Sequence, residues 1–232
     1  MKPIPDLNWP DLYHLLNHSG IARIPDFLTR EECDELIRSY SEASHFRSTI
    51  SMERYRFGKG EYKYYSYPLL PRIARMRTDF FTPLAKLANE WMNVLEIPVS
   101  YPEDHAVFIA QCHAAGQLRP TPLILKYEAG GYNTLHQDLY GEIYFPFQVV
   151  ILLTEPGRDH EGGELVFVEQ LPRAQSKATV IAPRQGDAVI FTTNFRPVKG
   201  TRGWYRSKMK HGVSTVTAGK RHACGIIFHD AA

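Results

Sequence analysis

Two histidines and one aspartate in the second half of the chain have the types and spacing of a metal site. His136 and Asp138 are separated by one residue, and His211 follows 73 residues after Asp138. Because side chains alternate between the two faces of a β-strand, His136 and Asp138 on a strand would point to the same side. With His211 they would offer two nitrogens and one oxygen to a metal such as Fe(II), leaving positions open for a co-substrate and O2.

A basic stretch follows this motif. Arg221 lies ten residues after His211, and a guanidinium can bind a carboxylate through two parallel hydrogen bonds. Residues 188–229 contain no Asp or Glu. They contain eight basic residues: Arg196, Lys199, Arg202, Arg206, Lys208, Lys210, Lys220 and Arg221. A block of one sign attracts anions, which favours an anionic co-substrate, an anionic substrate or both; the alternative is a solvated basic loop.

The other histidines downstream of Asp138 fit a metal site less well. His160 falls in a polar turn, and His229 follows the last expected strand. His222 comes directly after Arg221, so its side chain should point to the opposite face of a strand.

Composition indicates an ordinary globular protein. The chain has 232 residues, of which 44% are hydrophobic and 22% charged, with a formal net charge of +2. It has no apolar run as long as a membrane span and no signal-peptide core. Its three cysteines are far apart and lack C-x-x-C spacing, which argues against a disulfide framework or a zinc ribbon. We therefore expect a cytoplasmic protein with no membrane partner.

The first 119 residues are expected to be helical, with one hairpin. Leucines at helical spacing predict a helix over 9–18, and the capping-box pattern from Thr29 to Glu32 begins another. An extended hairpin is expected over 46–67 and a helix over 83–95. Asp104 can cap a short helix that runs to about residue 115.

From residue 120 onward the pattern changes to short strands separated by Gly and Pro turns. The expected strands are 122–128, 132–138, 144–154, 164–169, 178–181, 187–193, 209–216 and 222–228. This pattern predicts an α+β, mainly β chain of one domain over 1–232. Its core over 120–232 would be a cupin-like jelly roll (a double-stranded β-helix), buttressed by an N-terminal extension over 1–119. His136 and Asp138 would lie on the second strand, His211 on the seventh, and Arg221 at the turn into the eighth.

The motifs together resemble the Fe(II)/2-oxoglutarate-dependent oxygenase superfamily from about residue 120 to the end. They are Leu125-Lys126-Tyr127, Gly130-Gly131-Tyr132-Asn133, His136-Gln137-Asp138, the apolar strand 149–153, Gly162-Gly163-Glu164-Leu165, 185–191, His211-Gly212 and Arg221. More narrowly, the chain resembles a bacterial group described as nucleic-acid oxygenases. Residues 62–68 and 112–122 also fit that group, so this resemblance spans nearly the whole length.

The resemblance implies a mechanism and a set of cofactors. Fe(II) would be bound by His136, Asp138 and His211, and 2-oxoglutarate would chelate the metal while Arg221 binds its far carboxylate. O2 would take the last position, and decarboxylation to succinate and CO2 would drive hydroxylation or oxidative demethylation of a substrate. Tyr127 and Gln148 are further candidates for hydrogen bonds to 2-oxoglutarate, although each could be an ordinary buried polar group.

The sequence leaves the primary substrate and the oligomeric state open. Residues 47–67 interleave basic and aromatic side chains, which can hold phosphates and stack bases, although Glu53 and Glu61 dilute the charge. The candidate substrate contacts are Arg56, Tyr64, Tyr65, Asn133 and Arg206. The helix after Thr29 is similar to one in prolyl-hydroxylase-like members, so a protein or peptide substrate is an alternative, and a small molecule is another.

Two readings from other functional classes also remain. A non-oxidative cupin-type metalloenzyme would not need an anchor at Arg221. A non-catalytic jelly-roll binding module would not need the three metal ligands.

Overall fold

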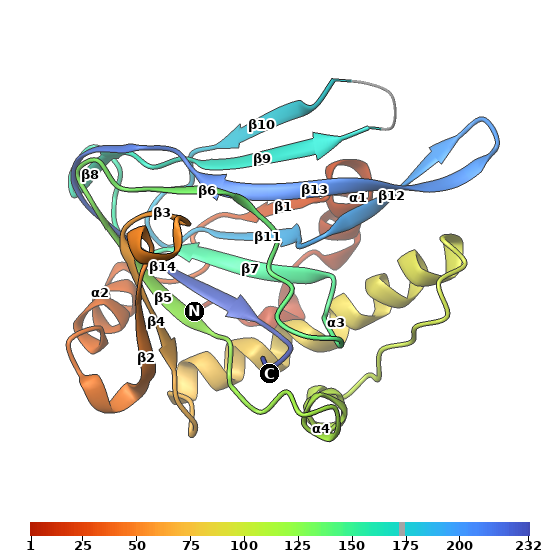
Figure 1. The fold of residues 1–232 in the computed structure, drawn as a ribbon, viewed down its shortest axis with the longest axis horizontal. Helices are drawn as coiled ribbons and strands as arrows, with labels where there is room; N and C mark the ends of the chain where they lie inside the picture. The colour runs from red at the N-terminus through yellow and green to blue at the C-terminus, as the bar shows by residue number, and fades with distance from the viewer. Residues whose placement is uncertain (172–174) are drawn as a thin grey trace.

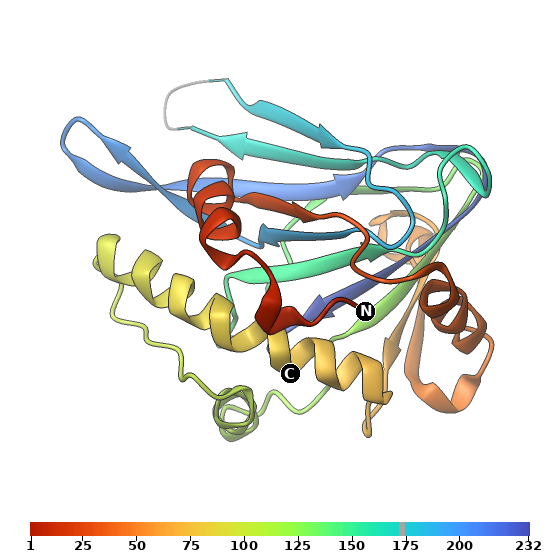
Figure 2. The ribbon, with the colours of Figure 1, turned by 180° about the vertical axis from the view of Figure 1, so that it is seen from behind.

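Two antiparallel sheets face each other, and helices cover the outer face of the larger one (Figures 1 and 2). This arrangement is seen in a computed structural model that describes residues 1–171 and 175–232. The predicted double-stranded β-helix with buttressing helices is therefore confirmed. Among the described helices, none is both long and apolar enough to pass through a membrane.

The α-helices lie on the outer side of the larger sheet, whereas the short η3 lies beside β3 (Gly58–Lys59). The bounds of the helices are η1 (Ile4–Asp6), α1 (Trp9–Ser19), α2 (Arg30–Ser39), η2 (Ala43–His45), η3 (Glu53–Tyr55), α3 (Pro71–Val94) and α4 (His105–Ala114). The predicted capping box is present, since the Thr29 side chain accepts from the Glu32 amide and Glu32 accepts from the Thr29 amide. Asp104 caps α4 through the Ala106 amide, as expected.

The helix expected over 83–95 is longer than predicted. It begins at Pro71, so Pro83 lies inside α3 rather than at its start. Pro71 is a natural first helical residue because the first helical N–H groups have no partner within the helix. The added turns bury Phe80 and Phe81 in the main core, and this burial outweighs the cost of an internal proline.

The larger sheet joins strands from both ends of the chain. Its order is β1 (Ile21–Ile24), β11 (Ala188–Thr192), β7 (Phe147–Leu152), β14 (Val216–Ile227), β5 (Leu123–Glu128), β4 (Glu61–Tyr65) and β2 (Phe46–Ser51), with β8 (His160–Gly162) paired to β14. Because β1, β2 and β4 come from the first third of the chain, the N-terminal extension contributes strands to this sheet. We infer that residues 1–232 form one domain.

The smaller sheet lies over the larger one. Its order is β10 (Lys177–Ile181), β9 (Leu165–Gln170), β13 (Gly203–Val213), β6 (Tyr132–His136) and β3 (Gly58–Lys59), with β12 (Phe195–Gly200) paired to β13. The predicted neighbours β6 and β13 do pair, with His136 directly opposite His211. The fold thus brings distant parts of the sequence together at this point.

Along the central strands, alternate side chains point to opposite faces of the larger sheet, one toward the helices and the other toward the smaller sheet. On β7, Phe147, Val149 and Ile151 belong to the core shared with the helices. Gln148 and Val150 point the other way, into the space between the two sheets. The helix-facing side is therefore a packed core, and the sheet-facing side is available for a polar site.

All eight expected strands are present, but several bounds differ. The second strand ends at His136, so Asp138 lies just beyond β6 rather than on it. The seventh begins at Gly203 and the eighth at Val216, in both cases six residues earlier than predicted. The expected eighth strand is too short because Gly219, shortly before Arg221, is a residue typical of turns. Gly219 instead has a left-handed φ of 75° within β14, near the point where the pairing with β8 shifts register. As a result Arg221 lies inside a strand rather than at a turn.

Candidate metal centre

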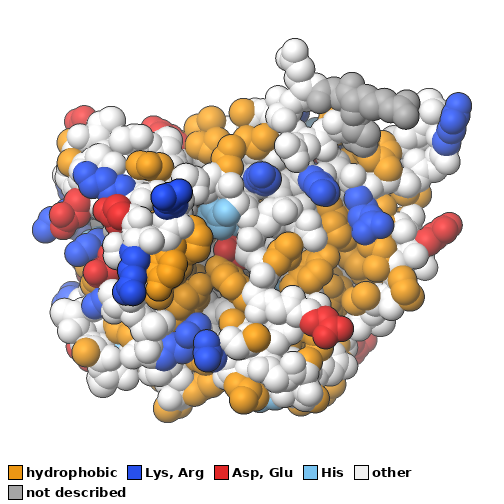
Figure 3. Space-filling view, viewed as in Figure 1, with side chains coloured by type: hydrophobic (Ala, Val, Ile, Leu, Met, Phe, Trp, Pro, Cys, Tyr) orange, Lys and Arg blue, Asp and Glu red, His pale blue; other side chains and the backbone are white. Residues whose placement is uncertain are grey.

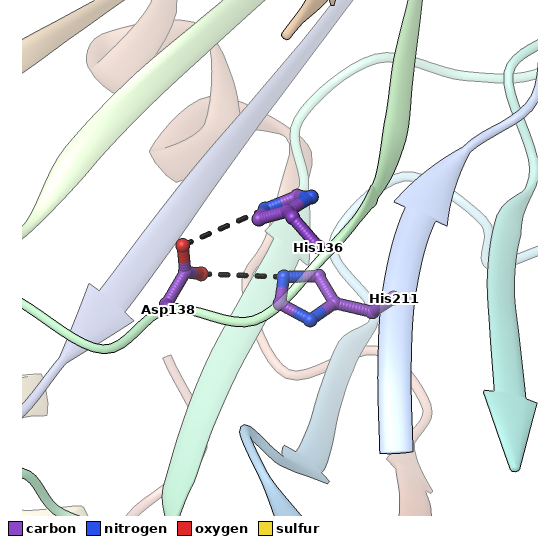
Figure 4. Close-up of side chains that lie close together, drawn as sticks. All are labelled: His136, Asp138 and His211. Atoms are coloured by element: carbon purple, nitrogen blue, oxygen red, sulfur yellow. Dashed lines mark ion pairs between the residues drawn. The ribbon is translucent and has the colours of Figure 1, made fainter. Parts of the chain in front are cut away.

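His136, Asp138 and His211 converge between the two sheets (Figure 4). One ligand atom from each of the three residues lies within 4.8 Å of the others. The Nε2 atom of His136 is 3.5 Å from Oδ1 of Asp138, and that of His211 is 3.2 Å from Oδ2. Two imidazole nitrogens and one carboxylate therefore face a common point, which is the donor set expected for Fe(II).

The hydrogen bond behind His136 sets its tautomer. Its Nδ1 lies 2.7 Å from the carbonyl oxygen of Thr134, which can only accept, so Nδ1 carries the proton. The lone pair of the neutral ring then lies on Nε2, the atom that faces Asp138. Such a bond to the remote nitrogen is how proteins orient metal-binding histidines. His136 is therefore preorganised to bind a metal through Nε2.

Asp138 is held as a buried carboxylate. Burial alone would raise its pKa, but the adjacent imidazoles and a hydrogen bond from Tyr140 bring the pKa well below its usual range. The Tyr140 hydroxyl donates to Oδ1 at 2.6 Å. Burial, with the carboxylate beside it, raises the pKa of Tyr140, so this hydroxyl stays a donor. Tyr140 therefore orients the carboxylate.

A cavity of about 210 Å³ opens onto these three residues. Its lining includes three further polar side chains from the larger sheet, Tyr127 on β5, Gln148 on β7 and Arg221 on β14. In the view of Figure 3, a histidine and an acidic side chain are visible in the hollow near the middle of this face. The cavity is large enough to hold a small ligand next to the three candidate metal ligands.

Arg221 is a buried cation that forms no ion pair with the described residues, although the negative charge of Glu164 is near enough to offset part of the effect that burial has on its pKa. Its side chain is 1% exposed, and neither Nε nor Nη2 has a hydrogen-bond acceptor in the described part of the chain. It lies over the Tyr127 ring at 5.6 Å. Burial lowers the pKa of Arg221, but a guanidinium keeps its proton in proteins. Because an unpaired buried charge is costly, the cavity fits a ligand that brings a carboxylate to Arg221.

Further polar atoms around the cavity also lack partners among the described residues. They are the Tyr127 hydroxyl, Oε1 of Gln148 and Nδ1 of His211. The Gln148 amide nitrogen lies 3.1 Å from Nε2 of His211. Burial raises the pKa of Tyr127 to about 12, so its hydroxyl is a neutral donor. Of these groups, the Tyr127 hydroxyl can donate to the oxygens of 2-oxoglutarate, all of which accept, whereas Oε1 of Gln148 is itself an acceptor.

A glycine makes room for the arginine. Gly163 has a left-handed φ of 74°, and a Cβ atom there would lie 2.6 Å from Cδ of Arg221. Only glycine combines this backbone conformation with so close an approach. The Gly162-Gly163 motif therefore has a steric role beside the cavity.

The structure separates the candidate substrate contacts. Asn133 lines the cavity. Arg56 is exposed at the end of η3, and Arg206 is exposed on β13. Tyr64 packs beside the cavity, with its ring edge-on to that of Tyr140. The prediction for Tyr65 is wrong, because its side chain is fully buried in the main core.

The structure also shows where two histidines outside the candidate metal centre lie, His160 and His222. His160 was expected in a polar turn, but it is buried on β8. Burial and the nearby Arg221 lower the pKa of His160 to about 4, so it adds no second positive charge to Arg221 at neutral pH. His222 points away from the cavity and contacts Tyr40 at a ring distance of 5.7 Å, as its position next to Arg221 predicted.

Sequence reasoning missed Tyr140 and the role of Phe57. Tyr140 continues the alternation of His136 and Asp138 by two more residues, which is the signal that could have identified it. Phe57 lines the cavity although its side chain is 47% exposed, because it lies at the rim. No short-range pattern places Phe57 there.

Solved structures share the fold. A Pseudomonas putida prolyl-4-hydroxylase is 13% identical, with 96% of this chain and 100% of that chain covered and a TM-score of 0.55. A Burkholderia pseudomallei oxidoreductase of the 2OG-Fe(II) oxygenase family is 15% identical, with 98% and 93% covered and a TM-score of 0.55. These similarities show that the chain has a double-stranded β-helix fold, which holds the His-Asp-His cluster between its sheets.

The family follows from sequence similarity. The profile of Oxygenase-NA, described as an oxygenase catalysing oxidative methylation of damaged DNA, matches residues 60–231. Two Mycobacterium tuberculosis relatives, named uncharacterized proteins Rv2227 and MT2286, are each 47% identical over 165 residues, which is 71% of this chain and of theirs. The chain belongs to the Oxygenase-NA family and is an oxygenase.

Proposed function

We propose that the chain is an Fe(II)- and 2-oxoglutarate-dependent dioxygenase that hydroxylates or oxidatively demethylates nucleic acid. The observation that carries the cofactor assignment is Arg221, a fully buried cation that faces the same cavity as His136, Asp138 and His211 and forms no ion pair in the described part of the chain. A non-oxidative metalloenzyme would have no use for this charge. A binding module would need neither the charge nor the ligands.

Each residue of the cavity then has a role. Nε2 of His136, Nε2 of His211 and the Asp138 carboxylate would hold the iron. Arg221 would bind the far carboxylate of 2-oxoglutarate, with Tyr127 as an added hydrogen-bond donor. When bound, iron and 2-oxoglutarate supply oxidation by O2, one oxygen atom entering succinate as CO2 leaves and the other entering a C–H bond of the substrate.

The walls of the cavity support this chemistry by limiting water. Leu123, Leu125 and Val150 line it from the larger sheet, and Leu165 lines it from the smaller one. Apolar walls keep bulk water from the site and strengthen the electrostatic interactions inside it. The sheets therefore position the polar groups and exclude competing solvent.

Exposed aromatic rings at the mouth favour nucleic acid as the substrate. Phe57 stacks on Tyr55, with ring centroids 5.6 Å apart and planes inclined by 19°. The two rings are 47% and 48% exposed, and the Arg54 guanidinium lies 5.8 Å from the Tyr55 ring. Exposed rings beside cations can stack an unpaired base while holding its phosphate. An enzyme that oxidises a base must also receive that base out of the stack.

The cofactor assignment can be tested without knowing the substrate. Protein purified without oxygen should develop a visible charge-transfer band when Fe(II) and 2-oxoglutarate are added. His136→Ala should abolish the band, and admission of air to the wild type should yield succinate. Absence of both the band and succinate in the wild type would refute the assignment.

The substrate assignment needs a separate experiment. A single-stranded oligonucleotide carrying N-methylated bases should stimulate succinate formation and release formaldehyde in equal amount, because hydroxylation of an N-methyl group makes it leave as formaldehyde. Unmethylated oligonucleotide and a proline-containing peptide serve as comparisons. Stimulation by the peptide alone would assign the enzyme to peptide hydroxylation instead.

A further inference from the structure

The outer face of β13 carries a row of cations that the metal site does not use. Arg206, Lys208 and Lys210 are two residues apart, so their side chains leave the same face of the strand, about 6.7 Å apart along it. The intervening Ser207 and Met209 are buried. The three cations, called the β13 basic row, therefore face away from the interior.

No described carboxylate neutralises the β13 basic row. Across the sheet, Lys208 and Lys210 stand opposite Gln170 and Val168, and none of the three cations makes an ion pair in the described part of the chain. The nearest acid on β9, Glu169, pairs in register with Met209 and so lies on the opposite face. There it forms an ion pair with Arg196 at 2.7 Å. The positive charge of the row is thus left for an external anion.

The row leads from the metal site to an exposed aromatic ring. Lys210 immediately precedes His211, and Trp204 continues the same face beyond Arg206 with 47% of its side chain exposed. The hairpin of β12 and β13 extends past the facing sheets (Figures 1 and 2). Figure 3 shows basic side chains one after another along the line that β13 follows in Figure 1, beginning next to the visible histidine.

We propose that the β13 basic row binds the sugar–phosphate backbone of a single-stranded nucleic acid and aligns the strand with the cavity mouth, an inference that rests on the proposed function. Cations in single file along one strand match one phosphate chain. The β13 basic row alone would also suit an extended acidic peptide. The exposed aromatic rings favour nucleic acid over a peptide. Trp204 at the far end of the row and the stacked Tyr55 and Phe57 at the cavity mouth offer surfaces on which bases can stack.

The experiment compares two variants that lose the same charge. One combines Arg206→Gln, Lys208→Gln and Lys210→Gln. The control combines Arg38→Gln, Arg75→Gln and Lys86→Gln, which removes three exposed cations on α2 and α3. Binding to a fluorescein-labelled oligothymidylate is measured by anisotropy over a range of salt concentrations. Far-UV circular dichroism and the thermal midpoint verify that both variants are folded.

We expect the row variant to bind at least about tenfold more weakly and the slope of log K against log salt to fall by about two, since each phosphate contact contributes about 0.7. The control should change binding less than twofold. Equal loss in both variants would mean that only net charge matters, and no loss in the row variant would mean that the strand lies elsewhere. Competition by polyglutamate as effective as that by oligothymidylate would assign the row to an acidic protein. Each of these outcomes would overturn the proposal.

The cofactor assignment is read out separately. A wild-type protein that shows the charge-transfer band and forms succinate but does not bind oligothymidylate refutes the β13 basic row and leaves the oxygenase assignment standing. A protein that binds oligothymidylate through the row but shows neither band nor succinate refutes the cofactor assignment alone.

Discussion

Replacing Arg221 by methionine should stabilise the ligand-free protein or leave its stability unchanged, although Arg221 is one of the most buried side chains in the fold. The guanidinium is 1% exposed and forms no ion pair with the residues that the structure describes. Replacing buried ion pairs by apolar groups of similar volume is neutral or stabilising by about 1–4 kcal/mol, and a buried charge outside an ion pair has less attraction to lose. The contact with the Tyr127 ring offsets about 1–2 kcal/mol of this. The free energy of unfolding should therefore stay within about 1 kcal/mol of its original value or rise by up to about 3 kcal/mol.

A second buried arginine provides the control. Arg77 is 2% exposed, and its Nη2 lies 2.6 Å from the Asp230 carboxylate. Arg77→Met would leave Asp230 buried without its arginine. Hydrogen bonds from Tyr67 and His113 to this carboxylate would remain. Breaking such a buried ion pair costs about 3–5 kcal/mol. The same substitution should thus act differently at the two positions. Urea unfolding of the metal-free proteins measures both changes.

Arg221→Met should weaken the binding of 2-oxoglutarate, although it should not destabilise the ligand-free protein. Two charge-assisted hydrogen bonds of about 1.5 kcal/mol each correspond to an affinity loss of about 100-fold. Titration of the charge-transfer band without oxygen measures this affinity. If Arg221→Met destabilises the ligand-free protein as much as Arg77→Met, Arg221 has an anionic partner within the protein and the reasoning fails. An unchanged 2-oxoglutarate affinity would refute the anchor itself.

Three further outcomes are expected. Tyr140→Phe removes the hydrogen bond to Asp138 and should lower metal affinity about 10–100-fold in a metal titration; unchanged affinity would show that the carboxylate needs no such support. Gly163→Ala places a Cβ 2.6 Å from Cδ of Arg221 and should weaken 2-oxoglutarate binding about tenfold or more by the band titration, with less effect on metal affinity. Burial, with Arg77 nearby, lowers the pKa of His105 to about 4 in the folded state, so the free energy of unfolding should fall by up to roughly 3 kcal/mol as the pH falls from about 6.5 to about 4. His105→Gln should make the free energy of unfolding, measured with urea, depend less on pH in this range. An equally steep pH dependence in the variant would assign the loss to other groups.

Local patterns were sufficient to predict most strands and the His-x-Asp part of the candidate metal site. The short spacing from His136 to Asp138 and the apolar run of β7 are local signals. The capping box at Thr29 is equally local, since its partners are three residues apart. Such local features can be predicted from the sequence because they do not depend on which distant residues come into contact. The convergence with His211, 73 residues after Asp138, depended on the expected order of the strands.

Features that depend on distant partners could not be predicted. β12 was missed because its sequence has no apolar alternation and contains Pro197, which is tolerated because β12 pairs on one side with β13. Tyr65 was misassigned because both faces of β4 near its end are covered, Tyr64 by one cluster and Tyr65 by the main core. Arg221 was proposed from its spacing after His211, but only the three-dimensional structure shows that its guanidinium is buried and forms no ion pair with the described residues.

The position of β14 has a consequence for how the polypeptide reaches its native state. The strand carrying Arg221 lies between β5 and β7, both of which emerge from the ribosome well before it. Until β14 inserts, these two apolar strands each present an unpaired edge, the kind of surface that associates with other chains. Because β14 and β5 pair residues that are 92 to 102 positions apart, formation of this part of the sheet should also be slow. Nascent chains should therefore be most prone to aggregate in the interval between the synthesis of β7 and that of β14.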